Sequence, residues 1–192
     1  MGIVRSAKPV KLIAAIMAVN TEKIADAARE MQTLFGDIDL KSDIFSFSHS
    51  HYYRKEMGDN LVKQFFSFAP LVQIDLINHI KLTCNNIEIQ LSRNCEIEAK
   101  ICRRVNIDPG YISPAKLVLA TTKNYDHRIY IGQGIYAEVT LHYTKNRFQP
   151  WPWTYPDYQT DLSINFFKQV RAIYFQQLDT LGVQKIENVE TE

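Results

Sequence analysis

The segment from Arg128 to Tyr143 constrains the fold most, because it predicts a β-hairpin of defined register. Two runs of β-branched and aromatic residues, 128–131 and 135–143, flank Gly132-Gln133-Gly134, a three-residue loop typical of hairpins. The second run alternates between an apolar face (Ile135, Ala137, Val139, Leu141, Tyr143) and a polar face (Tyr136, Glu138, Thr140, His142). A shift of one residue would turn the apolar set outward, so we expect a well-specified register.

This register predicts three cross-strand pairs: Ile131 with Ile135, Tyr130 with Tyr136, and Arg128 with Glu138. The polar face then carries a patch of two charged and two tyrosine side chains. One interpretation is an ordinary cross-strand salt bridge beside a tyrosine pair. The other is a binding site, since charged residues are also concentrated just before the hairpin.

The segment before the hairpin contains signals for a turn and a helix start. Asp108-Pro109-Gly110-Tyr111 is typical of a tight turn that presents a carboxylate at the end of a strand. Ser113-Pro114 predicts a helix N-cap followed by proline at the first helical position, with Lys116 in the short helix. Lys123, Asp126 and His127 follow. Binding residues often gather on such connecting segments.

Composition excludes several classes of protein. Of the 192 residues, 46% are hydrophobic and 22% are charged, which is typical of a globular chain. The net charge of +1 gives no basic surface for nucleic acid, so a nucleic-acid partner is not expected. No apolar run reaches transmembrane length, so no membrane partner is expected. Three cysteines without a C-x-x-C pair favour a reducing, cytoplasmic location.

The order of predicted elements is β-α-β-β-α-β over residues 9–107, which indicates a ferredoxin-like α+β fold with an antiparallel sheet. The expected strands are 10–19, 44–48, 61–69 and 99–107, and the expected helices run from Thr21 to Gly36 and onward from Pro70. Residues 108–182 extend this core with the hairpin, an aromatic loop at 148–158 and a helix at 161–181. Residues 183–192 are expected to fray. The whole chain, 1–192, is interpreted as one domain.

Three shorter motifs resemble functional signatures but lack the residues that would complete them. His49-Ser50-His51 lacks a third ligand, so no metal site is predicted and the cofactor is unknown. The phenylalanines of 63–68 resemble part of an RNA-recognition signature, but we interpret them as core residues. Residues 122–126 resemble a guanine-reading segment, but the chain has no phosphate loop to accompany it. Glu56 is the carboxylate of interest in the loop at 49–60.

Several longer motifs carry a resemblance to a known family. They are Glu56-Met57-Gly58 and the runs VNIDPGYI, KLVLATTKN, HRIYIGQGIYAEVTL and PWTYPDY. Over residues 11–174 the chain resembles a bacterial family of unknown function, whose number is four-four-one-six. The resemblance implies a single-domain protein and supplies no catalytic residues.

Two functional hypotheses follow. In the first, a cytoplasmic enzyme or sensor binds a small anionic, phosphate-bearing ligand through residues 105–143. Candidate catalytic residues are His127, Glu138 and Asp108; candidate ligand-binding residues are Arg128, Lys116, Lys123, Tyr130, Tyr136 and Glu56. In the second, the chain is a non-enzymatic interaction module whose polar cluster is structural. Either hypothesis allows a homo-oligomer.

Overall fold

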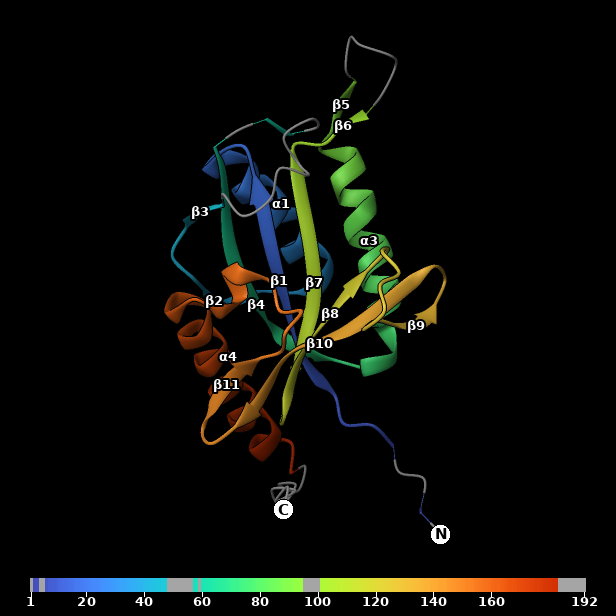
Figure 1. Ribbon diagram of the computed structural model, residues 1–192, viewed down its shortest axis with the longest axis vertical. Helices are drawn as coiled ribbons and strands as arrows, with labels where there is room; N and C mark the ends of the chain where they lie inside the picture. Colours follow the sequence, from blue (N-terminus) through green and yellow to red (C-terminus); the bar gives the residue numbers. More distant parts are fainter. Residues whose placement is uncertain (1, 4–5, 48–56, 59, 95–100, 183–192) are drawn as a thin grey trace.

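The computed structural model describes residues 2–3, 6–47, 57–58, 60–94 and 101–182 (Figure 1). Most strands join one antiparallel sheet: β1 (Val10–Ala18), β2 (Ile38–Lys41), β3 (Phe45–Phe47), β4 (Leu61–Val72), β7 (Val105–Ser113), β8 (Lys116–Thr121), β9 (Ile129–Gly132), β10 (Ile135–Thr144) and β11 (Arg147–Pro150). Two short strands, β5 (Arg93–Asn94) and β6 (Ile101–Cys102), pair separately.

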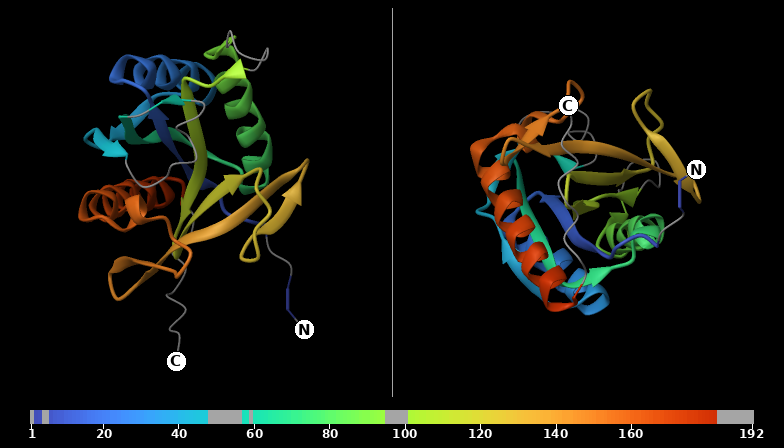
Figure 2. Two further views of the ribbon diagram at one scale, coloured as in Figure 1. Left: turned by 45° about the horizontal axis from the view of Figure 1, so that its top comes forward. Right: turned by 90° about the horizontal axis from the view of Figure 1, so that it is seen from below.

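The large sheet runs in the order β11-β10-β8-β7-β1-β4-β2, with β3 on β4 and β9 on β10. Helices α1 (Thr21–Phe35) and α3 (Ile77–Gln90) pack on one face of it, and α4 (Asp161–Thr180) packs on the other (Figure 2). Two short 3-10 helices, η1 (Ile74–Leu76) and η2 (Pro156–Gln159), precede α3 and α4. The predicted mixed α+β class with an antiparallel sheet is confirmed, with nine strands in the main sheet of the described chain.

Capping side chains set the helix starts. The Asn20 side chain accepts from Lys23 N at 2.9 Å and begins α1. The Thr160 hydroxyl accepts from Ser163 N at 3.2 Å and begins α4. Each cap satisfies a backbone N–H that has no partner within its helix.

Every residue of β1 is buried, because the strand lies in the middle of the sheet between two cores. Alternate β1 residues such as Leu12 and Ile16 join the core beneath α1 and α3. Ile13 and Ala15 join the second core, which is rich in aromatic rings and lies beneath α4. This is why the β1 sequence is apolar on both faces, apart from the buried Lys11, instead of alternating.

The predicted turn and short helix between residues 108 and 121 are wrong. Asp108 and Pro109 lie inside β7, where they pair with Ala15 and Ala14 of β1. Ser113 pairs with Lys116 across a two-residue connection, so β8 replaces the expected helix. Proline and its neighbours serve hairpin connections as well as helix starts, and the pairing of β7 with β1 outweighed the local turn preference.

Other predicted boundaries moved as well. The expected second strand at 44–48 corresponds to the short strand β3, and β2 is a further short strand before it that was not predicted; both pair with β4. Pro70 lies within β4 instead of opening a helix, and α3 begins only at Ile77. The aromatic loop at 148–158 contains the end of β11 and η2. The fourth strand is shifted from 99–107 to 105–113.

The hairpin of β9 and β10 has most of the predicted register. Tyr130 pairs with Tyr136 as expected, and their rings meet edge to face with centroids 5.3 Å apart. The loop is shorter than predicted, since Gly132 pairs with Ile135 in place of Ile131. Gln133 and Gly134 both have positive φ, the geometry that a two-residue hairpin loop requires.

The predicted single apolar face of β10 is wrong because Thr140 forms a β-bulge. Val139 pairs with Val118 and Leu141 pairs with Leu117, so Thr140 is the extra residue. Val139 packs against the core under α1 and α3, whereas Leu141 packs into the aromatic core. The bulge therefore moves the apolar side chains of β10 from one face of the sheet to the other.

Candidate functional site

The sheet opens where β8 separates from β7. Only Gly110–Ser113 of β7 pair with β8 in the described register. Ile107, before that point, is satisfied by α3: its N–H donates to Glu88 Oε1 at 2.7 Å, and its carbonyl accepts from Lys81 Nζ at 2.6 Å. Two charged side chains of α3 thus make the backbone hydrogen bonds of Ile107 that a neighbouring strand would otherwise make.

A cavity of about 570 Å³ lies in this opening. Part of its floor is a row of cross-strand neighbours on β4, β1 and β7: Lys63, Met17 and Asn106. Residues of α3, β8 and the segment 155–158 also line it. The volume is in the range of sites for small organic molecules.

The cavity wall is rich in charge. Its cationic side chains are Lys63, Lys81, Arg103, Lys123 and Arg128, and its carboxylates are Glu88, Asp108, Glu138 and Asp157. Burial raises the pKa of Glu88 above its ordinary value, against the opposing effect of Lys81. The described wall therefore carries an excess of positive charge, which favours an anionic occupant.

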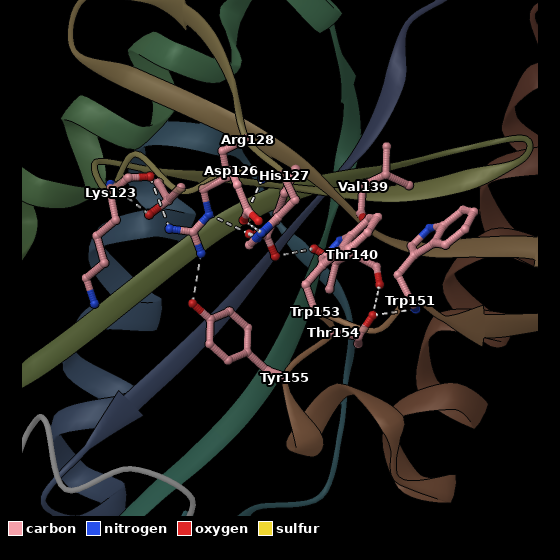
Figure 3. Close-up of polar contacts among 12 residues, drawn as sticks. Lys123, Asp126, His127, Arg128, Val139, Thr140, Trp151, Trp153, Thr154 and Tyr155 are labelled. Atoms are coloured by element: carbon pink, nitrogen blue, oxygen red, sulfur yellow. Dashed lines mark hydrogen bonds and ion pairs between the residues drawn. The ribbon is translucent and has the colours of Figure 1, made fainter.

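Arg128 lines one side of the cavity, and Figure 3 shows its guanidinium group directed toward the hydroxyl of Tyr155. Its Nε donates to Glu138 Oε2 at 2.7 Å, Nη1 donates to the Lys123 carbonyl at 3.1 Å, and Nη2 donates to the Tyr155 hydroxyl at 2.9 Å. The carboxylate of Glu138 raises the pKa of Arg128 against the opposing effect of burial. These contacts link the hairpin to the segment that carries Tyr155.

His127 lies behind the carboxylate of Glu138. Its Nε2 is 3.1 Å from Glu138 Oε2, and its Nδ1 is 3.1 Å from Asp126 Oδ1. The ring stacks on Trp153 at 5.2 Å between centroids, and Trp153 stacks on Trp151 at 5.4 Å. His127 is therefore enclosed between two carboxylates and an indole, and contacts the cavity through Glu138.

Hydrogen bonds fix the aromatic segment to β10. Trp153 Nε1 donates to the Val139 carbonyl at 3.0 Å, and the Thr154 hydroxyl donates to the Thr140 carbonyl at 2.5 Å (Figure 3). The carbonyl of the bulged Thr140 thus has a partner outside the sheet. This attachment holds Tyr155 within reach of Arg128.

Four residues expected at a functional site line the cavity together: Asp108, Lys123, Arg128 and Glu138. Asp108 is the most accessible carboxylate, with its side chain 33% exposed; it accepts from Asn106 Nδ2 at 2.8 Å and lies 3.7 Å from Lys81 Nζ. Burial lowers the pKa of Lys123 below its ordinary value.

The other expected residues lie elsewhere. Lys116 is exposed at the start of β8, where it pairs with His142, and is not part of the cavity wall. Tyr130 and Tyr136 form their ring pair on the hairpin without lining the cavity, and Tyr130 is exposed. Glu56 lies outside the described residues.

Sequence reasoning missed several polar residues of the wall, among them Lys63, Lys81, Glu88, Tyr155, Asp157 and Tyr158. A signal was present in two places. Lys81 and Glu88 lie seven residues apart, beside the apolar stripe of α3, so both occupy the face that packs on the sheet. Lys63 lies two residues before Phe65, on the same face of a strand whose side chains are buried.

The described residues contain no group of three or more histidine, cysteine, aspartate and glutamate side chains that could hold a metal ion. His49 and His51 lie outside them. Among the helices of the described ranges, none is long and apolar enough to cross a membrane.

The comparisons with known proteins gave one match. The model of the family described as "Domain of unknown function (DUF4416)" matches residues 8–174. No curated protein and no solved structure matches the chain.

Proposed function

The chain belongs to the DUF4416 family of unknown function, and we propose that it binds a small anionic ligand in the cavity between β7, β8 and α3. The observation that carries this proposal is the wall of the cavity, where five cationic side chains outnumber four carboxylates. An anion in such a partly enclosed site is attracted more strongly than at a water-exposed surface.

A phosphate-bearing ligand is the first class to test. Lysine and arginine side chains are the usual partners of phosphate oxygens in proteins. Lys123 lines the cavity near Asp108, which is accessible and can accept a hydrogen bond from a ligand hydroxyl. The ligand would therefore combine an anionic group with hydroxyl groups.

The site also suits a sensor or an enzyme. Glu138 contacts both Arg128 and His127. A ligand that binds beside Arg128 would therefore act on the imidazole of His127 through the carboxylate of Glu138. In an enzyme, Asp108 would be the carboxylate that reaches the ligand, Glu138 would act from the cavity wall, and His127 would act from behind Glu138.

Thermal-shift and calorimetric titrations with inorganic phosphate, sugar phosphates and nucleotides test the proposal. We expect a rise in melting temperature with at least one of these ligands. Lys123→Ala should weaken binding, whereas Lys116→Ala should not, since Lys116 lies away from the cavity. Absence of any shift, or equal effects of the two variants, would contradict the proposal.

A second candidate is a protein-interaction module. All three side-chain nitrogens of Arg128 donate within the protein, as expected for a structural group. On the edge strand β9, Ile129 is 73% and Tyr130 is 58% exposed. Exposed apolar residues on an edge strand can pair with another chain. Light scattering of wild type and Ile129→Lys would show whether this edge forms homo-oligomers.

A third candidate, RNA binding through the phenylalanines of β4, loses its support. Phe65, Phe66 and Phe68 are at most 3% exposed, so none of the three presents a ring on which a base could stack.

We further propose that the core is ferredoxin-like and that the protein is cytoplasmic. Strands β7-β1-β4-β2 are consecutive in the sheet and antiparallel, with α1 and α3 packed on one face. This matches the predicted β-α-β-β-α-β order, to which β8–β11 and α4 are added. Cys84 is a buried free thiol, which suits a reducing compartment.

A further inference from the structure

Tyr158 carries a buried hydroxyl for which the described residues supply no hydrogen bond. The residue lies in η2 and is 1% exposed, with its ring packed on Phe65 and Phe167 at centroid distances of 5.2 and 5.7 Å. Its hydroxyl has no hydrogen-bond partner in the described part of the chain. Such a group is destabilising unless something outside the chain satisfies it.

Tyr158 lines the cavity, and so do Asp108, Asp157 and Glu138, the carboxylates whose charge acts on its hydroxyl. Burial raises the pKa of Tyr158 well above its ordinary value. The phenol therefore stays protonated at neutral pH and is available as a hydrogen-bond donor.

Lys63 lies beside this hydroxyl-bearing ring. Its ammonium is 4.8 Å from the centroid of Tyr158 and donates to Asp157 Oδ2 at 2.6 Å. It also lies 5.3 Å from the ring centroid of Phe47, an aromatic neighbour that cannot accept a normal hydrogen bond. Within the described residues Asp157 is the hydrogen-bond acceptor that the structure gives this ammonium, which has three N–H groups.

The cavity has an inner and an outer end. Lys63, Asp157 and Tyr158 contact one another in the wall and are each at most 5% exposed, and we take this buried group as the closed end. Tyr125 is 52% exposed, and the Asp108 side chain is 33% exposed, so they lie at the open end. A ligand that passes Asp108 can then reach the buried wall residues Lys63 and Tyr158.

We propose that Lys63 and Tyr158 form an oxyanion subsite at the closed end of the cavity. It binds a phosphate or carboxylate oxygen of the ligand, while Asp108 at the open end accepts a ligand hydroxyl. This inference rests on the proposed function and deepens it, because it assigns the ligand class: a small hydroxylated oxyanion, either a polyol phosphate or a hydroxy acid.

The test uses calorimetric titration of the full chain with glycerol 3-phosphate, glycerate, inorganic phosphate and neutral glycerol. The subsite predicts that at least one of the three oxyanions binds more tightly than glycerol. Glycerol 3-phosphate and glycerate distinguish phosphate from carboxylate as the preferred oxyanion. Equal affinity for glycerol and for all three anions would overturn the role of Lys63.

Tyr158→Phe is the decisive variant, because it removes the hydroxyl and leaves the ring. Its affinity for the bound oxyanion should fall roughly tenfold or more, as for loss of a hydrogen bond to a charged group. Its melting temperature without ligand should be unchanged or higher, since the buried hydroxyl has no partner to lose.

Tyr174→Phe is the matched control, because the hydroxyl of Tyr174 donates to the Pro9 carbonyl at 2.9 Å and lies in the core beneath α4. It should lower the melting temperature and leave the affinity unchanged. One outcome separates the two proposals: wild type binds an oxyanion, Lys123→Ala weakens that binding, and Tyr158→Phe leaves it unchanged. In that case the subsite is wrong and the proposed function stands. If wild type binds none of the three oxyanions, the subsite is wrong, and the proposed function is wrong as well only if the nucleotides and sugar phosphates also fail to bind.

Discussion

Glu138 accepts from Arg128 Nε at 2.7 Å across the β9–β10 hairpin, with both side chains at most 2% exposed. A buried pair of this kind adds little net stability relative to apolar residues, but removing one partner leaves an uncompensated charge. The pair therefore fixes the hairpin and the segment at Tyr155 in a single arrangement.

Glu138→Gln should lower the free energy of unfolding by about 3 kcal/mol, because Arg128 keeps its charge in a buried position. Urea denaturation measures this loss. The double variant Arg128→Met/Glu138→Leu should be less destabilised than the single variant. Equal losses would show that the charge of Arg128 is satisfied without Glu138. Glu22→Gln, on the exposed first turn of α1, is the control.

Gly110→Ala should be destabilising because β7 and β8 are too close at this position for a methyl group. A Cβ there would lie 2.3 Å from the Val118 carbonyl oxygen and 2.8 Å from the Leu119 side chain. We expect a loss of at least about 2 kcal/mol by chemical denaturation. Gly134→Asn is the control, since its Cβ meets nothing within 4 Å and asparagine tolerates positive φ.

Stability should fall at alkaline pH through Tyr174. Burial raises its pKa to about 12 from the ordinary value of 10.0. As pH rises, the unfolded chain loses the Tyr174 proton near pH 10, whereas the folded chain keeps it until about pH 12. Because the folded state binds more protons between these two values, the free energy of unfolding declines as pH rises from about 10 toward 12. At pH 11 this titration lowers the free energy of unfolding by about 1 kcal/mol.

The free energy of unfolding between pH 9 and 11.5 should therefore decline less steeply in Tyr174→Phe than in wild type. Tyr158→Phe should also flatten the profile, because burial raises the pKa of Tyr158 in the same direction. Identical slopes in wild type and Tyr174→Phe would contradict the assignment.

Deleting Thr140 should be far more destabilising than Thr140→Ala. The deletion removes the extra residue, so Leu141, which is fully buried, would have to leave the aromatic core or pull β10 out of register with β8. Thr140→Ala keeps the bulge and loses a hydroxyl contact to Glu138 Oε1 at 3.3 Å, at about 1 kcal/mol. Circular dichroism melts compare the two variants, and equal melting temperatures would rule out this role for the bulge.

Local sequence signals predicted the elements whose evidence lies within a few residues. The Asn20 cap and the apolar run of β1 place the first strand and helix almost as the structure has them. Tyr130 and Tyr136 pair as expected although the loop is shorter than predicted, because the register shifts between Ile135 and Tyr136. Asp108 was misplaced, since its turn signal was outweighed by pairing with β1, a partner more than 90 residues earlier.

Within the candidate site, the sequence predicts only those contacts whose residues are close in the chain. Arg128 and Glu138 lie in one hairpin, and their contact follows from its register. Lys63 and Asp157 lie 94 residues apart, and their ion pair follows from the packing of η2 against β4, which no local pattern encodes. The bulge at Thr140 was equally hidden, because an alternating sequence gives no sign of an inserted residue.

Trp151 and Trp153 are the only two tryptophans of the 192 residues, and both lie in the ring stack against His127. Ultraviolet emission at tryptophan wavelengths therefore originates entirely from the segment that attaches Tyr155 to β10. Because that segment continues directly into the cavity wall, occupancy of the cavity can be followed by a native optical signal, with no dye or label attached.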